Sequence, residues 1–145
     1  MPAVEDFIDN GFQPVLADPD SPDPSSVERV VLTTGKVHYD LLSARRKAGA
    51  SKVALLRVEQ LYPLPDEEIA DALALYPDAS DIVWCQEEPA NQGAWSYIAL
   101  NLPEALPEGK RLRRVSRKAG ASPAAGSSKV HEAEQAALVS AALEV

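Results

Sequence analysis

Apolar and β-branched residues are concentrated in three short runs of the chain, at residues 29–34, 52–59 and 81–85. Runs of this length without polar alternation are typical of strands buried in a parallel sheet. A fourth run, residues 110–118, is strongly basic and alternates only loosely. Lysine and arginine on an edge strand oppose its pairing with another sheet. The pattern therefore predicts four strands, with the last one near the sheet edge.

Between these runs, apolar residues recur at helical spacing. Helices are expected at residues 36–47, from Pro65 until Pro77, at residues 93–101, and after a cap at Ser127 or Ser128. The apolar face of the last helix is expected to consist of Val130, Ala137, Leu138, Ala141 and Ala142. Alternating strands and helices indicate an α/β fold, a three-layer αβα sandwich with a mostly parallel sheet.

The first 28 residues do not have the pattern of an independent fold. Their apolar residues are scattered, and a proline-rich, acidic stretch follows at residues 17–26. Two interpretations stay open, a flexible leader or an arm that lies across a surface absent from this chain. We therefore divide the chain into an N-terminal arm and linker, residues 1–28, and one domain, residues 29–145. The scattered apolar anchors of the arm are Phe7, Phe12, Val15 and Leu16.

Length, charge and composition argue against nucleic-acid-binding and membrane-spanning classes of protein. A length of 145 residues suits one core, and a net charge of −8 argues against a nucleic-acid partner. The start of the chain has no basic segment followed by an apolar run, and no apolar stretch approaches the roughly 20 residues of a membrane helix. Cys85 is the single cysteine, which fits a reducing compartment. We expect a cytoplasmic protein that binds neither nucleic acid nor membrane.

Candidate chemistry is richest at residues 84–95, where a strand ends in two carboxylates, a proline, Asn-Gln-Gly and a second tryptophan. Ligands and partners of open α/β sheets meet beyond the carboxyl ends of the strands. Glu87 and Glu88 point to opposite faces if the strand continues, so they are not expected to share a proton as an acid–base pair. We expect one to be solvated and the other to bind the loop or a partner's arginine. Trp95 is either a core residue or an interface anchor.

The remaining candidates have structural interpretations that compete with functional ones. Thr-Thr-Gly followed by Lys36 at a strand-to-helix turn is too short for a phosphate-binding loop. His38 and His131 fall in different helices without a third ligand nearby, and Cys85 is expected to be a buried, inert thiol. The basic run is either a solvated edge strand or a contact for an anion or an acidic partner. Its charged residues are Arg111, Arg113, Arg114, Arg117 and Lys118.

Four long segments resemble one enzyme family, in its order and at its spacing. They are VVLTTGKVHYDLL at residues 30–42, RVEQLYPLP at residues 57–65, WCQEEPANQGAW at residues 84–95 and ASPAAGSSKVH at residues 121–131. Together with the arm at residues 4–7, they resemble the C-terminal domain of the thiamine-diphosphate-dependent decarboxylase component of 2-oxoglutarate dehydrogenase.

The resemblance implies a transketolase-type C-terminal domain within an enzyme of the tricarboxylic acid cycle. Such enzymes decarboxylate 2-oxoglutarate and pass the succinyl group to a lipoyl arm, using thiamine diphosphate and magnesium held by two preceding domains of a homodimer. The Gly-Asp-Gly diphosphate motif is absent here, so no catalytic residue, cofactor or metal ligand is assigned to this chain. The implied partners are the upstream domains, the homodimer mate and the lipoyl succinyltransferase component. Residues expected to border the active-site entrance and the interface are Gln86, Glu87, Glu88, Asn91, Gln92, Gly93 and Trp95.

An alternative interpretation is a stand-alone regulatory module for an anionic nucleotide-like ligand. Actinobacterial relatives are described as binding acetyl-CoA as a regulator, but the corresponding arm here lacks the expected lysine and serine. Whether the parent is a plain or a multifunctional fused enzyme, and whether its substrate is 2-oxoglutarate or a related 2-oxo acid, both stay open. The candidate anion contacts are Lys36, Arg57, Arg113, Arg114 and Arg117.

Overall fold

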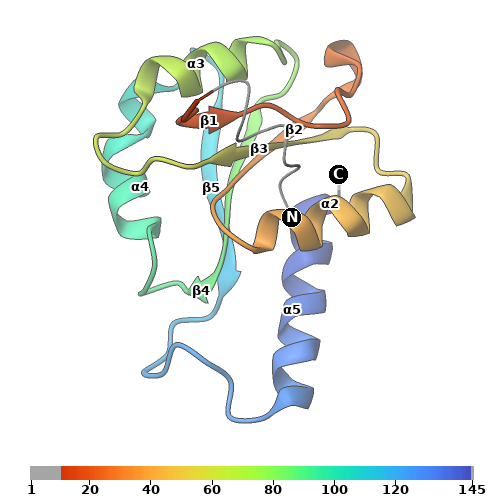
Figure 1. The fold of residues 1–145 in the computed structure, drawn as a ribbon, viewed down its shortest axis with the longest axis vertical. Helices are drawn as coiled ribbons and strands as arrows, with labels where there is room; N and C mark the ends of the chain where they lie inside the picture. The colour runs from red at the N-terminus through yellow and green to blue at the C-terminus, as the bar shows by residue number, and fades with distance from the viewer. Residues whose placement is uncertain (1–10, 145) are drawn as a thin grey trace.

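The computed structural model describes residues 11–144, which form one five-stranded sheet with helices on both faces (Figure 1). The strands are β1 (Val15–Leu16), β2 (Arg29–Thr33), β3 (Val53–Val58), β4 (Asp81–Pro89) and β5 (Arg111–Arg117). The helices are α2 (Val37–Ala48), α3 (Asp66–Ala74), α4 (Trp95–Asn101) and α5 (Ser128–Leu143), with short 3-10 helices η1 (Pro24–Ser26) and η2 (Pro103–Ala105).

The strand order is β1-β3-β2-β4-β5, and β5 lies at an edge as its basic composition predicts. Strands β2 to β5 are parallel, whereas β1 pairs with β3 in the antiparallel direction. The predicted α/β class with a mostly parallel sheet is confirmed. Strand β4 is longer than the predicted 81–85 and continues through Pro89, with an irregular register against β5 between Cys85 and Pro89.

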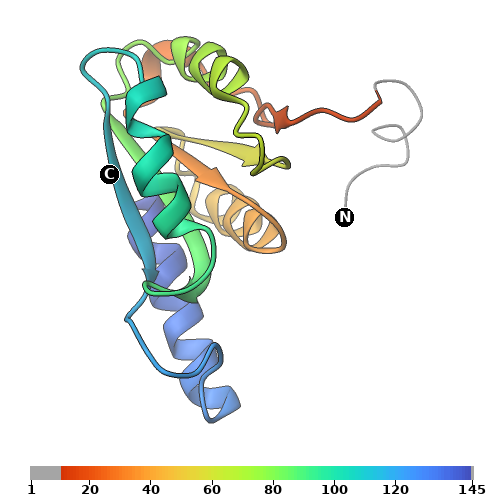
Figure 2. The same ribbon diagram turned by 90° about the vertical axis from the view of Figure 1, so that its left-hand side faces the viewer.

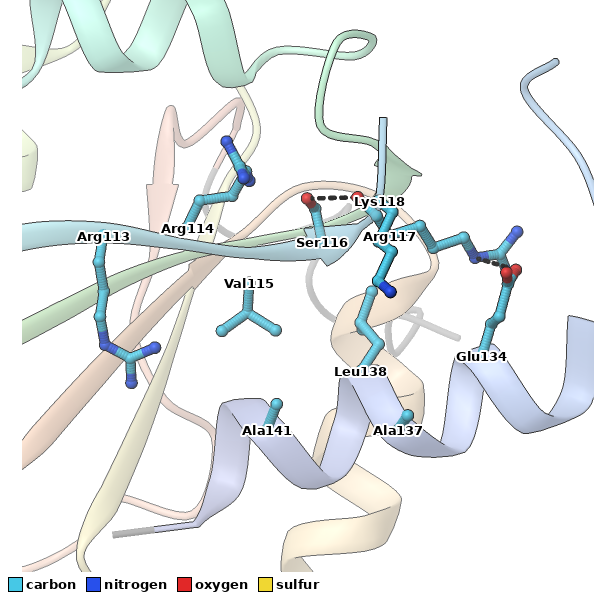
Figure 3. A pocket seen from close by; sticks show the side chains of 10 residues that line it. All are labelled: Arg113, Arg114, Val115, Ser116, Arg117, Lys118, Glu134, Ala137, Leu138 and Ala141. Carbon is cyan, nitrogen blue, oxygen red and sulfur yellow. Dashed lines mark hydrogen bonds and ion pairs between the residues drawn. The ribbon is translucent and has the colours of Figure 1, made fainter. Parts of the chain in front are cut away.

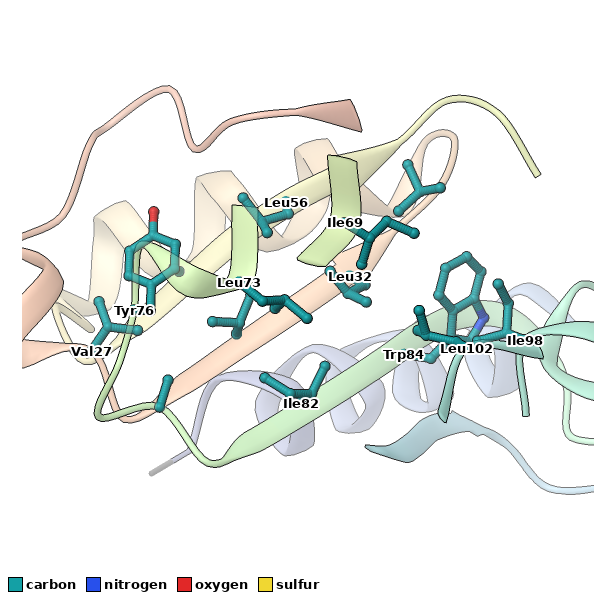
Figure 4. Close-up of a cluster of buried hydrophobic side chains, with 14 residues drawn as sticks. Val27, Leu32, Leu56, Ile69, Leu73, Tyr76, Ile82, Trp84, Ile98 and Leu102 are labelled. Atoms are coloured by element: carbon teal, nitrogen blue, oxygen red, sulfur yellow. The ribbon is translucent and has the colours of Figure 1, made fainter. Parts of the chain in front are cut away.

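Strand residues alternate between two apolar layers, so the fold is a three-layer sandwich. On one face α3 and α4 pack against the sheet, and Trp84 lies next to Ile98 and Leu102 of this layer (Figure 4). On the other face, α2 and the C-terminal part of α5 cover Val31, Val83 and Cys85. Figure 1 shows the sheet between these two helical layers. Burial of both strand faces explains why these runs lack polar alternation.

The described part of the N-terminal segment packs on the domain itself. Val15 and Leu16 pair with β3, and the Glu59 amide donates to the Pro14 carbonyl at 2.8 Å. Val27 is fully buried in the core beneath α3. Phe12 is exposed, and Phe7 and the family-like residues 4–7 lie outside the described residues. Pro14, Val15, Leu16 and Val27 therefore contact this chain's own sheet or core, while the division at residue 28 stays a prediction.

Helix α5 begins at the expected cap, because the Ser127 hydroxyl accepts a hydrogen bond from the Val130 amide. Its apolar face was only partly predicted. Leu138, Ala142 and Leu143 are buried, but three expected members of that face, Val130, Ala137 and Ala141, are exposed. Val130 belongs to the N-terminal half of α5, which projects beyond the end of the sheet, as Figures 1 and 2 show. Ala137 and Ala141 belong to the C-terminal half and line a groove between α5 and β5.

Candidate functional site

Gln86 organises the loop that follows β4. Its side chain is 2% exposed, and its Oε1 accepts hydrogen bonds from the Trp84 indole and the Trp95 amide, each at 3.0 Å. Its Nε2 donates to the Pro89 carbonyl at 3.1 Å and the Gln92 carbonyl at 2.7 Å. Both ends of this amide are therefore used to hold the loop against the strand, as a buried polar group requires.

Gly93 permits the close approach of that loop. Its φ is +66°, a left-handed conformation that costs a side-chain-bearing residue roughly 1–2 kcal/mol. A Cβ at this position would lie 3.1 Å from the Glu88 Cβ and 3.2 Å from the Gln86 amide atoms. Gly93 is thus required for both conformation and space.

Glu87 and Glu88 have different surroundings. The Glu87 Oε1 lies 3.2 Å from the Lys36 ammonium and accepts a hydrogen bond of 3.0 Å from Gln135. Glu88 is exposed. Lys36 also pairs with Asp40 at 3.3 Å, and the hydrogen bond with Glu87 is the largest cause that raises the pKa of Lys36. The two carboxylates do not share a partner, so the arrangement supports no acid–base pair.

Two further loop residues bind the segment that follows β5. The Asn91 side chain donates to the Gly120 carbonyl and accepts from the Gly120 amide, both at 3.0 Å. The Gln92 side chain donates to the same carbonyl at 3.2 Å. Loop 89–95 is thereby joined to the loop before α5. Trp95 is half-buried against the core, and the Arg114 guanidinium lies 5.4 Å from the centre of its ring.

The basic candidates do not converge on one site. Arg113, Arg114 and Arg117 line a groove between β5 and α5, whereas Lys36 lies beside Glu87. Arg57 donates to the Tyr39 hydroxyl at 2.5 Å and pairs with Glu59 at 2.7 Å. Among residues 11–144, the groove between β5 and α5 is lined by the three arginines of β5 but by neither Lys36 nor Arg57.

Gln135 was not identified from the sequence, yet it joins three elements at the carboxyl end of the sheet. Its Nε2 donates to Asp40 and Glu87 at 3.0 Å, and its Oε1 accepts from Arg117 at 3.3 Å. It lies on α5, far along the chain from β4. A glutamine inside a helix gives no signal of such a position, because only the packing of α5 brings it to the sheet.

Cys85 and His38 are buried groups with shifted ionisation. Burial, reinforced by the nearby Glu87 carboxylate, raises the pKa of the Cys85 thiol to about 12, so the predicted inert thiol agrees with its surroundings. Burial lowers the pKa of His38 to about 4, with a further contribution from Arg57. The His38 Nδ1 lies 3.2 Å from the Thr33 hydroxyl. Neither group faces a reacting partner in this arrangement.

Within residues 11–144, no group of three or more His, Cys, Asp or Glu side chains is placed to hold a metal ion. None of the helices in that part of the chain is long and apolar enough to cross a membrane. The described residues therefore do not supply a donor set for magnesium.

Residues 2–143 match the family described as "2-oxoglutarate dehydrogenase C-terminal". The chain belongs to this family. It is the C-terminal domain of the 2-oxoglutarate dehydrogenase E1 component, as its sequence segments predict.

Curated relatives match nearly the whole chain. The 2-oxoglutarate dehydrogenase E1 component of Haemophilus influenzae is 45% identical over 141 residues, which are 97% of this chain and 15% of the relative. The E1/E2 component of Corynebacterium glutamicum is 42% identical over 98% of the chain and 12% of its own length. The multifunctional 2-oxoglutarate metabolism enzyme of Mycolicibacterium vanbaalenii is 45% identical over 94% of the chain and 11% of its own length. The chain thus spans 11–15% of the length of these relatives.

The fold also has a solved counterpart. A split-gene transketolase, described as an inactive beta4 tetramer, superposes with a TM-score of 0.61 over 93% of this chain and 43% of that chain, at 17% identity. At this identity the likeness concerns the fold alone. It confirms the transketolase-like α/β architecture of the 2-oxoglutarate dehydrogenase C-terminal domain.

Proposed function

We propose that this domain contributes structure and interface to a 2-oxoglutarate dehydrogenase E1 decarboxylase and is not catalytic alone. The proposal rests mainly on the extent of the match: the 141 residues aligned with the Haemophilus influenzae E1 component make up only 15% of that relative. The internal hydrogen bonds of Gln86, Asn91 and Gln92 support the proposal, because they make the loop after β4 a rigid surface rather than a set of free reactive groups.

The chemistry of the parent enzyme is assigned to domains outside this chain. Thiamine diphosphate, with magnesium, would supply the decarboxylation chemistry there. The described residues do not fit either group, since no acidic or histidine cluster is present among residues 11–144 and the sequence lacks the Gly-Asp-Gly motif. We assign no step of the reaction to residues of this domain.

The proposed partners are the upstream thiamine-binding domains, the homodimer mate and, through the assembled enzyme, the lipoyl succinyltransferase component. Glu88 is an exposed carboxylate near the end of β4, so it is available to a neighbouring domain. Trp95 is half-buried at the start of α4. The relatives are bacterial enzymes, so we propose that the parent enzyme works in the cytoplasm. The free, buried thiol of Cys85 is compatible with that reducing compartment.

The test is reconstitution with the upstream domains of a related E1 component. We expect the two parts to co-elute in size-exclusion chromatography with light scattering, and the mixture to decarboxylate 2-oxoglutarate while neither part does so alone. A Glu88→Lys variant should weaken this assembly. A matched Glu132→Lys variant reverses a charge on the exposed part of α5 and should leave assembly unchanged.

A chain that stays a monomer in the mixture and restores no activity would contradict the proposal. Decarboxylation of 2-oxoglutarate by this chain alone would contradict the part of the proposal that the domain is not catalytic by itself. The regulatory alternative has no comparable support, because Lys36, Arg57 and the arginines of β5 do not share a pocket.

A further inference from the structure

The β5 edge of the sheet borders a groove that the proposed function assigns to no partner. The groove lies between β5 and α5 and has a volume of about 620 Å³. Val115 and Leu138 point toward each other across it, and Arg114 points to the opposite side of the strand (Figure 3). Its lining residues are Arg113, Arg114, Val115, Ser116, Arg117, Lys118, Glu134, Ala137, Leu138 and Ala141.

The groove is lined by basic residues of β5, although the chain as a whole is acidic. Seven of the chain's 14 lysines and arginines lie between Gly109 and His131, a stretch without an aspartate or glutamate, although the whole chain has a net charge of −8. Sequestering positive charge in this way creates a local field that attracts acidic partners. An edge strand that is only exposed to solvent does not need its basic residues to be kept apart from acidic residues in this way.

Arg117 in this groove is a buried guanidinium with an unpaired N–H group. Its side chain is 8% exposed, yet its Nε has no hydrogen-bond partner among the described residues. The Glu134 carboxylate lies 3.7 Å from that Nε, while the other end of the guanidinium contacts His131 at 2.9 Å and Gln135 at 3.3 Å. A buried guanidinium with an unsatisfied N–H has capacity for one more acceptor.

Among residues 11–144, no strand pairs with the outer side of β5. The strand is the last in the order β1-β3-β2-β4-β5, and its contacts with β4 use one edge only. The outer edge of such a strand presents free amide and carbonyl groups, which can pair with an added strand. The exposed Ala137 and Ala141 leave room beside that edge, because neither side chain is larger than a methyl group.

We propose that this groove binds an extended acidic segment of a partner protein, added as a further strand to the outer edge of β5. Carboxylates on one face of the added strand would contact Arg117, and those on the other face would approach Arg114. Arg113 would contribute only its remaining N–H groups, because its Nε and Nη2 already donate to Asp81 at 2.7 and 2.9 Å. Small apolar side chains would lie over Ala137 and Ala141. Charge complementarity selects the partner, and strand pairing fixes its direction and register.

The test measures fluorescence anisotropy of a labelled short peptide of alternating glutamate and valine, titrated with the 145-residue chain. We expect saturable binding that weakens as salt is raised, since exposed charges are screened. A peptide of the same composition with N-methylated alternate residues, made in either register, keeps its charge but loses half of its backbone donors. At least one of these two peptides should bind about tenfold more weakly.

Two groove variants and one control separate this site from general electrostatic attraction. Lys118→Glu reverses an exposed charge at the groove, and Ala137→Glu adds bulk and negative charge beside the β5 edge. Each should reduce the affinity about tenfold. Lys47→Glu makes the same charge change on the exposed side of α2, outside the groove, and should retain binding. Thermal unfolding of all variants verifies that they are folded.

Three results would overturn the inference. Equal binding of the N-methylated and unmodified peptides would show attraction of anions without strand addition. Equal losses in Lys47→Glu and Lys118→Glu would show that net charge alone matters. Self-association of the chain that excludes the peptide would place a second copy in the groove instead. None of these results depends on whether the domain assembles with the upstream part of the enzyme. The reconstitution experiment tests the proposed function, and the peptide titration tests the groove, so a failure of one can be distinguished from a failure of the other.

Discussion

Asp18 and Arg45 form a buried ion pair that fastens the N-terminal segment to α2. The Arg45 Nη2 lies 2.7 Å from the Asp18 Oδ1, and the Arg45 Nη1 contacts the second carboxylate oxygen. That oxygen also accepts from the Leu55 amide at 2.7 Å, so the pair reaches β3 as well. Arg45 donates further to the Val53 carbonyl at 3.0 Å. Both charged groups therefore have the additional hydrogen bonds that a buried pair needs.

Removal of this carboxylate charge should be strongly destabilising. Asp18→Asn leaves Asp20, 2.8 Å from the Arg45 Nη2, as the only carboxylate partner of the buried guanidinium among the described residues, and we expect a loss of about 2–3 kcal/mol. The free energy of unfolding in urea measures the effect. Asp71→Asn, at an exposed position on α3, is the matched control and should change stability by less than about 0.5 kcal/mol. Similar values for the two variants would contradict a structural role for the pair.

Substitution of Gly93 should destabilise the loop after β4. Gly93→Ala forces a side chain into a left-handed conformation and places its Cβ 3.1 Å from the Glu88 Cβ, so we expect a loss of about 1–3 kcal/mol in thermal or urea unfolding. Gly126→Ala is the control, because a Cβ at that position would have no heavy atom of another residue within 4 Å beyond its chain neighbours. A neutral Gly93→Ala would mean that the loop adopts a different conformation.

Gln86→Leu tests the hydrogen-bonding centre of the same loop. The change removes the acceptor of the Trp84 indole and the Trp95 amide, and leaving a buried donor unpaired costs about 1–3 kcal/mol. Urea unfolding followed by tryptophan fluorescence reports on both stability and the surroundings of the two indoles. Unchanged stability and fluorescence would show that the amide does not hold the loop.

Acidification should weaken the fold through His38. Its pKa is lowered from 6.5 to about 4 by burial, so the unfolded chain binds a proton that the folded chain excludes. The contribution of this group to stability is complete above pH 6.5 and is lost as the pH falls toward about 4. His38→Asn should therefore lose less stability than the wild type between neutral pH and about pH 5.

His131→Asn serves as the control for that experiment, because His131 is exposed on α5. It should retain the pH dependence of the wild type in urea unfolding. If His38→Asn follows the same pH profile as the wild type, another group is responsible for the loss.

Cys85 provides a direct readout of opening of the sheet. It is fully buried in β4, and its pKa of about 12 keeps it as the unreactive thiol near neutral pH. A thiol reagent should therefore modify the folded protein only slowly, and the rate should rise as urea populates unfolded molecules. A Ser122→Cys variant adds a thiol on an exposed loop and should gain one rapidly modified group.

Local sequence patterns were sufficient to predict the layers of the fold. The apolar runs of β2, β3 and β4 lack alternation because both of their faces are covered, and that burial is what their composition encodes. The basic composition of β5 likewise predicted its edge position. Long motifs in register, such as residues 84–95, predicted the family that the comparisons confirm.

Positions that depend on long-range packing were not predictable in the same way. Sequence periodicity placed Val130, Ala137 and Ala141 on the buried face of α5, yet they are exposed because half of the helix projects past the sheet and the rest borders a groove. Helical periodicity describes which residues share a side, but not what covers that side.

The sequence alone therefore determined the order and type of the main elements and the family, because these depend on neighbouring residues and burial. It placed the end of β4 at residue 85, whereas the strand continues through Pro89. Tertiary structure decided that Asp18 pairs with Arg45 and that Gln135 of α5 contacts α2, β4 and β5. It also decided that Arg114 lies over Trp95 whereas Arg113 pairs with Asp81. Those relationships join residues far apart in the chain, and their geometry arises only when the layers pack together.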